Sequence, residues 1–421
     1  MLSNLRADLR FALRSLWRRP GFSAFIVLTL GLGIGANTAM FAVVHAALIK
    51  PLPYQDPERL VFGRCTFEGR INPWASAPDY YDYRDQADTL ESLAALTGFT
   101  DKVTVTGGQR PERAAVLLVT QNFFPVLGVK PFAGRWFSAE EGEPGGADVI
   151  VLDGGFAARW AGGAREAIGR TLAVNGRSAT VVGVMPATFR FLYDVDMWVP
   201  ARRGEGAAGA ARRFHNWLMV GRLKRGVPLE VARHQVDAIS KRLEEQYPDS
   251  NRNKALRLDT LQAGLTGEER PSLLLLMGAV AMVLLIACAN VAGILLARGR
   301  GRRSELTVRA SLGATRWQLV RQLLIESLVL AFAAGVMGIV LGAWLRTLLP
   351  VAIGLDRDGA SSTGIGWPVL WFALTVTLAT GVLFGIVPAL RGASANLAGG
   401  LAPGTRTTDG KGGARLRSIL A

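Results

Sequence analysis

Four aspartates recur at every third position within a tyrosine-rich stretch: Asp79, Asp82, Asp85 and Asp88. Carboxylates placed in pairs can carry out general acid–base chemistry. The same spacing suits the first turns of a helix, because Ser76 can cap that helix, Pro78 is tolerated at its start, and the helix dipole favours acids there. The capped helix is the favoured interpretation, and we expect it to run over residues 79–95.

Other catalytic and metal-binding patterns are missing from the sequence. It contains no GxxxxGK[ST] phosphate loop, HExxH or CxxC motif, and no nucleophile elbow. His45, His215 and His234 are scattered, which indicates packing or surface positions rather than metal ligands. Cys65 falls in a polar region and Cys288 in an apolar one, so no internal disulfide is expected. The sequence therefore predicts no catalytic residues, no metal site and no cofactor.

The positive charge is unevenly distributed along the 421 residues. The chain carries 48 Lys and Arg against 33 Asp and Glu, but 29 of the former and 27 of the latter fall within residues 50–270. The excess of positive charge therefore flanks the apolar runs, as the positive-inside rule describes for membrane proteins. A nucleic-acid-binding protein would carry this charge on its folded domain, so nucleic acid is not an expected partner.

Four apolar runs are long enough to cross a membrane, since about 20 helical residues span the hydrocarbon core. They cover residues 22–48, 273–296, 323–349 and 367–390. Residues 1–20 alternate leucines with arginines at helical spacing, which predicts an amphipathic helix lying on membrane lipids. A cleaved signal peptide is the alternative, but the first run is far longer than a signal core of about 7–15 residues.

Small residues recur every fourth position in the first apolar run, at Gly31, Gly35 and Ala39. Such a face predicts close helix packing. Two polar residues, Asn290 and Glu326, lie in or near spans, where polar groups carry a functional hypothesis by default. For Glu326, a structural pairing with a nearby arginine is the favoured interpretation.

Residues 50–270 alternate short β-like runs with helical patterns and turn signals, which predicts an α+β domain. The arginines place the N-terminus, the link 298–321 and the tail 391–421 in the cytoplasm, and residues 50–270 outside it. The expected fold is an α-helical membrane protein with four transmembrane helices and a large α+β extracytoplasmic domain inserted between helices 1 and 2.

The link 298–321 is more structured than a simple turn requires. It carries seven arginines and one acid. Ser304 suits an N-cap, Glu305 and Arg309 are spaced as an i, i+4 ion pair, and Gly313 suits a helix stop. Thr315 then restarts a helix, with Gln318 completing a capping box. We expect a helix–turn–helix elbow.

Several stretches make the chain resemble a known family. They are ELTVRASLGATRWQLVRQLLIES in the elbow, LTLGLGIGANTAMFAVVHAALIKPLPYQDPERLV near the N-terminus, and NFFPVLGVKPFAGRWF, AIGRTLAVNG, VVGVMP and GRLKRGVPLEVA between them. They resemble the MacB/FtsX-type permeases of ABC transporters. The likeness is greatest to the duplicated MacB-like permeases, of which this chain corresponds to the N-terminal half. It is therefore expected to be a truncated or split product, or a homodimer if complete.

The resemblance implies a multi-pass protein of the bacterial inner membrane, with both termini cytoplasmic and no enzymatic activity of its own. It implies a separate ABC ATPase beneath the permease, a homodimer or pseudo-dimer, and a periplasmic adaptor. Motion driven by ATP would pass to the periplasmic domain, for export or mechanotransmission. The alternative is a membrane-anchored regulator of an extracytoplasmic partner such as a cell-wall hydrolase. The implied contacts with the ATPase are Glu305, Arg309, Gly313, Ala314 and Arg316.

Overall fold

The chain forms two compact units in the computed structural model. The structure describes residues 10, 12, 14, 16, 17, 20–72, 74–107, 111–204, 211–267, 269–301, 315–352 and 366–394. The membrane unit comprises Met1–Ala42, Leu276–Leu349 and Ile365–Ala421, and the second unit comprises Val43–Leu275 and Pro350–Gly364. The expected amphipathic helix 1–20 and tail 391–421 lie mostly outside the described residues.

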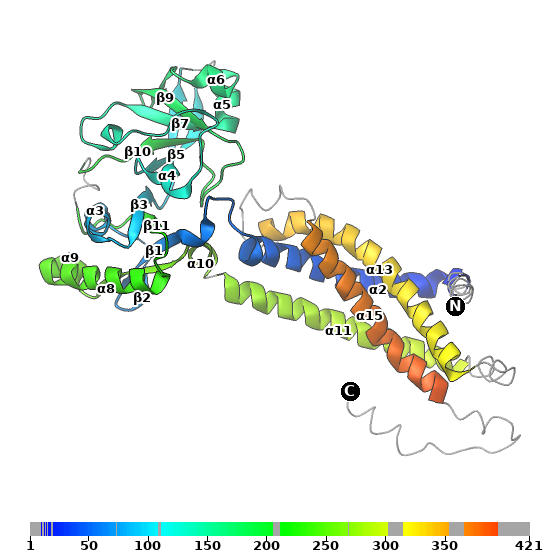
Figure 1. Cartoon of the computed structure of the whole chain (residues 1–421). Helices are drawn as coiled ribbons and strands as arrows, with labels where there is room; N and C mark the ends of the chain where they lie inside the picture. Colours follow the sequence, from blue (N-terminus) through cyan, green and yellow to red (C-terminus); the bar gives the residue numbers. More distant parts are fainter. Residues whose placement is uncertain are drawn as a thin grey trace, which may run out of the picture. The chain divides into compact units, whose positions relative to one another are not determined.

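Long helices make up the described part of the membrane unit (Figure 1). They are α2 (Pro20–Val44), α11 (Arg270–Gly301), α13 (Arg316–Ala352) and α15 (Trp367–Ser394). Four stretches are long and apolar enough to cross a membrane: Pro20–Ile49, Arg270–Ala297, Val320–Trp344 and Trp367–Ile386. A helix satisfies its own backbone hydrogen bonds, which is why apolar runs of this length fold this way in lipid.

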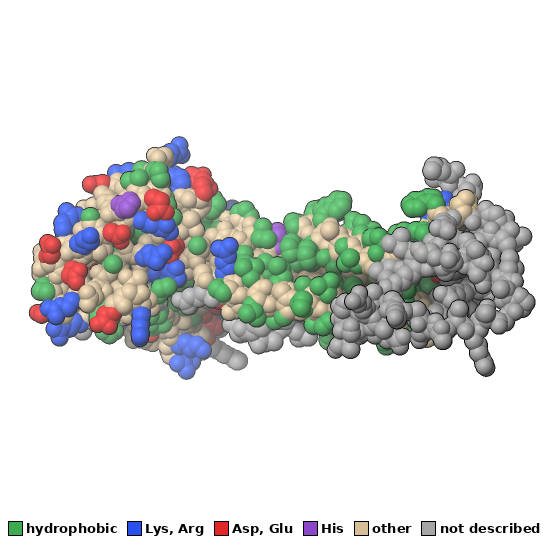
Figure 2. Space-filling view, turned by 90° about the horizontal axis from the view of Figure 1, so that it is seen from below, with side chains coloured by type: hydrophobic (Ala, Val, Ile, Leu, Met, Phe, Trp, Pro, Cys, Tyr) green, Lys and Arg blue, Asp and Glu red, His purple; other side chains and the backbone are tan. Residues whose placement is uncertain are grey.

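The helices of the membrane unit are apolar on their outer as well as their inner sides. A buried cluster joins all four helices, including Ile34, Val291, Ala334 and Phe384. Large apolar side chains such as Phe332 remain exposed, and Figure 2 shows hydrophobic side chains along the described surface of this unit. Helices that are hydrophobic all round belong in a membrane, because lipid tails can cover the outer sides.

The second unit is an α+β domain. Its strands are β1 (Leu60–Phe67), β2 (Arg70–Ile71), β3 (Leu90–Thr97), β4 (Asp101–Thr106), β5 (Glu112–Val119), β6 (Ala133–Gly134), β7 (Val149–Asp153), β8 (Thr171–Val174), β9 (Arg177–Met185), β10 (Met197–Pro200), β11 (Trp217–Leu223) and β12 (Lys254–Thr260). Its α-helices are α3 (Ala77–Gln86), α4 (Phe123–Leu127), α5 (Gly154–Ala161), α6 (Ala164–Ala167), α8 (Leu229–Gln246), α9 (Pro248–Asn251) and α10 (Leu261–Thr266). Figure 2 shows basic and acidic side chains interspersed over this unit's surface.

The strands form a small barrel fused to an open sheet. Their order is β10-β7-β9-β8-β4-β5-β3-β11-β1-β12, and β10 also pairs with β5. That extra pairing closes β4, β5, β10, β7, β9 and β8 into a ring, whereas β3, β11, β1 and β12 continue outward from β5. Closure removes the exposed edges of the ring. At the outer edge of β12, Ser240 accepts a hydrogen bond from the Leu256 amide and Arg233 donates one to the Leu258 carbonyl, so α8 covers this edge.

Separate apolar cores fill these two parts. Inward residues of the ring, including Val116, Ile150, Leu172 and Met197, pack with Phe156 of α5. On one face of the open sheet, α3 and α8 pack against a cluster that includes Tyr80 and Val236. The opposite face carries an aromatic cluster around Phe124.

The prediction of one helix is wrong for the second half of its range. The pattern predicted a helix over 79–95, but α3 ends at Gln86 and Leu90–Thr97 is strand β3. The sequence LESLAALT is rich in helix formers, yet β3 pairs with β11 along most of its length and is buried on both faces. Tertiary pairing therefore overrides local helix propensity here. Asp88 lies outside the helix as a result.

Candidate functional site

The expected ATPase-coupling elbow is only partly within the described residues. Glu305, Arg309, Gly313 and Ala314 lie outside them, and so does the side chain of Arg316. The beginning of the second helix is described: α13 starts at Arg316, directly after Thr315.

The capping box predicted at Thr315 is confirmed. The Thr315 amide donates to Gln318 Oε1 at 2.8 Å, and the Gln318 amide donates to Thr315 Oγ1 at 3.4 Å. Reciprocal bonds of this kind satisfy two backbone donors that a helix start leaves free. The link therefore enters α13 through a defined helix start.

Both helices that border the link extend beyond their apolar spans toward it. The span in α11 ends at Ala297, whereas the helix continues to Gly301. The span in α13 begins at Val320, whereas the helix starts at Arg316. Each helix therefore continues without a break from its apolar span toward the link.

Glycines bring α2 and α13 into backbone contact. A Cβ atom added to Gly35 would lie 2.9 Å from the Gly338 carbonyl oxygen, and one added to Gly338 would lie 3.0 Å from the Gly31 carbonyl oxygen. Ala39, the third small residue predicted for this face, is buried. Close approach of this kind increases van der Waals contact, which drives helix association in lipid. The structure thus places Gly31 and Gly35 against α13.

Polar side chains in the membrane unit differ in how they are satisfied. The amide nitrogen of Asn37 donates to the carbonyl oxygens of Gly33, at 2.9 Å, and of Val280 on α11, at 3.1 Å. Asn290 is instead exposed on the surface of α11. Glu326 is half-buried on α13.

The segments through which the chain enters and leaves the α+β domain are held together by hydrogen bonds. The chain enters after α2 through the π-helical turn His45–Ile49 and leaves through α10, which leads into α11. The side-chain amide of Gln262 in α10 donates to the Leu48 carbonyl at 2.9 Å and to the Lys50 carbonyl at 3.2 Å. We call this contact the base joint. It holds the entering and leaving segments of the domain together.

The aspartate series resolves into a buried charge cluster rather than an acid–base pair. Asp79 is fully buried, and its carboxylate accepts hydrogen bonds from Ser76 Oγ at 2.6 Å, Arg212 Nη1 at 3.0 Å and Asn251 Nδ2 at 3.0 Å. Lys254 Nζ contacts it as well. Ser76 is also the N-cap of α3, as the sequence predicted. Since both carboxylate oxygens are occupied and buried, this group is suited to holding α3, α9 and β12 together.

The electrostatics of this cluster fit a structural role. Burial alone would raise the pKa of Asp79, but the Lys254 ammonium and the hydrogen bonds hold that pKa below its ordinary value. Burial lowers the pKa of His215, and the charge of Lys254 lowers it further. Arg212 also pairs with Asp82 at 2.6 Å and lies 3.6 Å above the ring of Tyr247. Sequence inspection missed this cluster, because Lys254 is 175 residues from Asp79.

Among the residues that the structure describes, no three His, Cys, Asp or Glu side chains gather as a metal site would require. The histidines lie apart, in the π-helical turn after α2, in the segment before β11, and on α8.

Comparison with protein families identifies the chain. The model of the MacB-like periplasmic core domain matches residues 23–239, just over half of the sequence. The chain belongs to the MacB/FtsX family of ABC transporter permeases. The FtsX-like permease C-terminal model matches residues 277–397 of this permease.

Curated relatives agree with this assignment. The macrolide export ATP-binding/permease protein MacB of Chromobacterium violaceum is 26% identical over 74% of the chain and 49% of its own length. The uncharacterized ABC transporter permease YknZ of Bacillus subtilis is 24% identical over 93% of the chain and 97% of its own length. The probable syringafactin export ATP-binding/permease protein SyfD of Pseudomonas syringae is 25% identical over 64% of the chain and 39% of itself. The chain thus spans about half, or less, of these ATP-binding/permease relatives.

Solved structures also match part of the permease. A putative permease domain from Porphyromonas gingivalis aligns with a TM-score of 0.40 at 16% identity, covering 49% of the chain and 93% of that domain. The periplasmic region of MacB from Actinobacillus actinomycetemcomitans aligns with a TM-score of 0.38 at 13% identity, covering 50% of the chain and 92% of that region.

Proposed function

We propose that this permease transmits ATP-driven motion of a separate ABC ATPase to its extracytoplasmic α+β domain, for export or mechanotransmission. The observation that carries the proposal is the capped start of α13 at Thr315, together with helices that run unbroken from the link into the spans. The relative YknZ, matched over 97% of its length, is named a permease alone, which supports an ATPase on a separate chain. The permease itself would have no enzymatic activity.

The docking contact would lie in the elbow 298–321. Its residues would be Glu305, Arg309, Gly313, Ala314 and Arg316. Glu305 and Arg309 would present one acid and one base to the ATPase surface, and Gly313 would allow the turn between the two helices.

The domain boundaries follow the same plan. Residues 50–270 would form the periplasmic core domain, with spans over 22–48, 273–296, 323–349 and 367–390, an interfacial helix over 1–20 and a cytoplasmic tail over 391–421. Gly31, Gly35 and Ala39 would form the packing face that lets α2 and α13 move together.

Co-purification with ABC ATPases of the source cell tests the proposal. The intact permease is expected to retain an ATPase and to change its ATP turnover. The double variant Glu305→Ala/Arg309→Ala should lose both effects, whereas Lys241→Ala on the exposed face of α8 should keep them. Unchanged retention and turnover in the double variant would refute the docking contact. Capture of a cell-wall hydrolase without any ATPase would favour the regulatory alternative.

A second copy of the permease would complete the membrane unit as a dimer. Asn290 is exposed within the span Arg270–Ala297, next to apolar side chains such as Ile286, which is 60% exposed. An amide facing hydrocarbon is costly, and two such amides can satisfy each other across a helix pair. Asn290→Leu should therefore weaken dimerisation in detergent. Thr375→Val is the matched control, because Thr375 is exposed but already donates to the Trp371 carbonyl at 2.8 Å.

The protein would lie in the bacterial inner membrane, among lipids, with both termini in the cytoplasm and a periplasmic adaptor bound to the domain. Cysteine labelling in intact cells tests this orientation. Ser304→Cys should react only after the membrane is permeabilised, and Lys241→Cys should react from outside. The opposite pattern would reverse the topology.

A further inference from the structure

The ring of strands β4, β5, β10, β7, β9 and β8 is hollowed at one end. A cavity of about 820 Å³ lies there, lined by residues that include Asp101, Leu118, Arg177, Val199, Arg202 and Asn216. We call this cavity the barrel mouth. Its volume falls within the range of about 300–1,000 Å³ that is usual for small-molecule sites, and barrel mouths are common places for them.

The floor of the barrel mouth is the end of the barrel's own apolar core. Val103 and Val116 line the cavity and are also buried members of that core. Val174 and Val199 line it too and are only partly buried. Inward-facing residues alternate along each strand, so the apolar column of the barrel continues directly into the cavity. The floor would therefore accept apolar groups.

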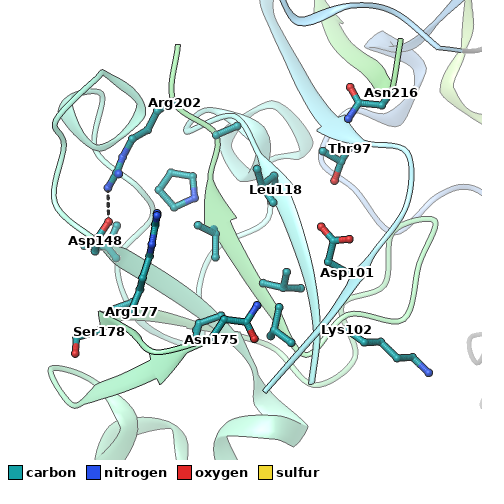
Figure 3. A pocket seen from close by; sticks show the side chains of 18 of the residues that line it. Thr97, Asp101, Lys102, Leu118, Asp148, Asn175, Arg177, Ser178, Arg202 and Asn216 are labelled. Atoms are coloured by element: carbon teal, nitrogen blue, oxygen red, sulfur yellow. Dashed lines mark hydrogen bonds and ion pairs between the residues drawn. The ribbon is translucent and has the colours of Figure 1, made fainter. Parts of the chain in front are cut away.

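A buried acceptor without a partner lies at one side of this floor. Asn216 is 8% exposed, and its Oδ1 atom has no hydrogen-bond partner among the described residues. Its backbone is fixed by bonds to Ala75, at 3.1 Å, and to Gly98, at 2.7 Å. Figure 3 shows its side chain directed toward the cavity, on the same side as Thr97 and Asp101. Buried carbonyl oxygens are nearly always bonded, so this one is suited to a donor that a ligand supplies.

Charges of opposite sign face each other across the cavity. Figure 3 shows Asp101 on the Asn216 side, with Arg177 and Arg202 on the other side. Arg202 is held by Asp148 at 2.8 Å and by the Gly146 carbonyl at 2.7 Å. Asp101 and Arg177 are exposed, and neither forms an ion pair within the part of the chain that the structure describes. One acid and one base are therefore available at opposite sides of an apolar floor.

We propose that the barrel mouth binds a short extended peptide with free termini and apolar side chains. Its ammonium group pairs with Asp101, an N–H group donates to Asn216 Oδ1, its side chains cover Leu118 and Val199, and its carboxylate pairs with Arg177. A short peptide combines these four groups in one molecule, which is the reason for choosing this ligand class. The proposal does not depend on an ATPase binding to the elbow, since the site lies wholly within the α+β domain.

Equilibrium dialysis of the full chain in detergent tests the site. The probe is a mixed set of apolar pentapeptides with free termini, quantified by mass spectrometry on both sides of the membrane. The full chain is expected to enrich a subset of these peptides. N-acetylated and C-amidated forms of the enriched peptides should bind at least tenfold more weakly, because each loses one terminal charge.

Variants then assign the binding to the barrel mouth. Asp101→Asn and Arg177→Gln should each weaken binding at least tenfold. Both side chains are exposed, so both variants should fold. Arg170→Gln is the matched control: Arg170 is an exposed arginine of the same domain that does not line the cavity, so binding should be unchanged. Absence of any enriched peptide would overturn the proposal. Equal affinity for free and capped peptides would overturn it as well. So would an Asp101 or Arg177 variant that binds the peptides as tightly as the unmodified chain does.

Discussion

The α+β domain and the membrane unit bring distant segments together by opposite means. In the domain, a fully buried carboxylate, Asp79, gathers two cations and two neutral donors from segments up to 175 residues away. In the membrane unit, Gly35 and Gly338 let two helices touch backbone to backbone. The described polar side chains there mostly bond to their own helix, as Thr38 does to the Ile34 carbonyl at 2.7 Å.

The difference follows from what surrounds each unit. In water, a charged cluster must offset the desolvation of its members, and here both carboxylate oxygens of Asp79 have partners. In lipid, apolar side chains gain nothing by leaving their surroundings, so association depends on close packing. The contacts that hold distant segments together are thus polar in the domain, whereas in the membrane unit they are made by small residues.

Removal of Asp79 should give the largest effect. Asp79→Ala removes the counter-charge of the buried Lys254, whereas Arg212 keeps its pair with Asp82, and should reduce the free energy of unfolding by about 3–5 kcal/mol. Asp85→Ala is the control, because Asp85 belongs to the same helix but is half-exposed and pairs only at the surface; it should cost less than about 1 kcal/mol. Denaturant titration followed by tryptophan fluorescence would measure both. Similar losses of unfolding free energy in the two variants would mean that the buried cluster contributes no more to stability than a surface ion pair.

A bulky side chain at the glycine contact should come next. Gly35→Leu forces α2 away from the Gly338 carbonyl and should destabilise the membrane unit by about 1–3 kcal/mol. Gly278→Leu is the control, since a Cβ atom there would meet nothing within 4 Å. Thermal unfolding in detergent compares the two variants. If Gly278→Leu lowered the unfolding temperature more than Gly35→Leu, the α2–α13 contact would not be what holds these two helices together.

The base joint offers a smaller, local test. Gln262→Ala removes two hydrogen bonds to the backbone and should cost about 0.5–1.5 kcal/mol. Hydrogen exchange should accelerate mainly in residues 45–50, where the acceptors lie. Gln235→Ala also removes two hydrogen bonds, both from Thr89, and should leave residues 45–50 protected. Equal exchange in both variants would show that Gln262 does not hold the joint.

The pH dependence of stability should be the smallest effect. His215 has a lowered pKa in the folded domain, so the unfolded chain binds the proton more readily. The stability it contributes is present above about pH 6.5, the ordinary histidine pKa, and is lost as pH falls through the lower folded value. His215→Asn should flatten this part of the profile. Asp79 affects stability at lower pH. The stability that its ionised carboxylate contributes is present above about pH 4 and is lost below it. A profile that His215→Asn leaves unchanged would contradict this assignment.

Sequence reasoning performed best where one local rule decides the structure. Long apolar runs without charges predicted the four transmembrane helices, and the residue types at Ser76 and at Thr315 with Gln318 predicted helix starts that the structure contains. These features depend on neighbours in sequence, which a pattern can display.

The sequence did not predict features that depend on contacts between distant segments of the chain. The strand Leu90–Thr97 carries a helix-forming composition, and only pairing with β11 makes it extended. The partners of Asp79 lie far along the chain, so no spacing could reveal that this carboxylate is buried. The barrel mouth needs the β10–β5 pairing to exist at all, because it closes the ring. The elbow residues stay predictions.

The proposed coupling carries ATP-driven motion through the elbow to the α+β domain. It is tested most directly by pulsed electron–electron resonance on the permease with its ATPase, with Cys65 and Cys288 replaced and a spin label at Lys241→Cys on α8 of each copy. The distance between the two labels should change when ATP binds, and Glu305→Ala/Arg309→Ala should abolish this change. A distance distribution that ATP leaves unaltered in the unmodified elbow, with the ATPase bound and active, would contradict it.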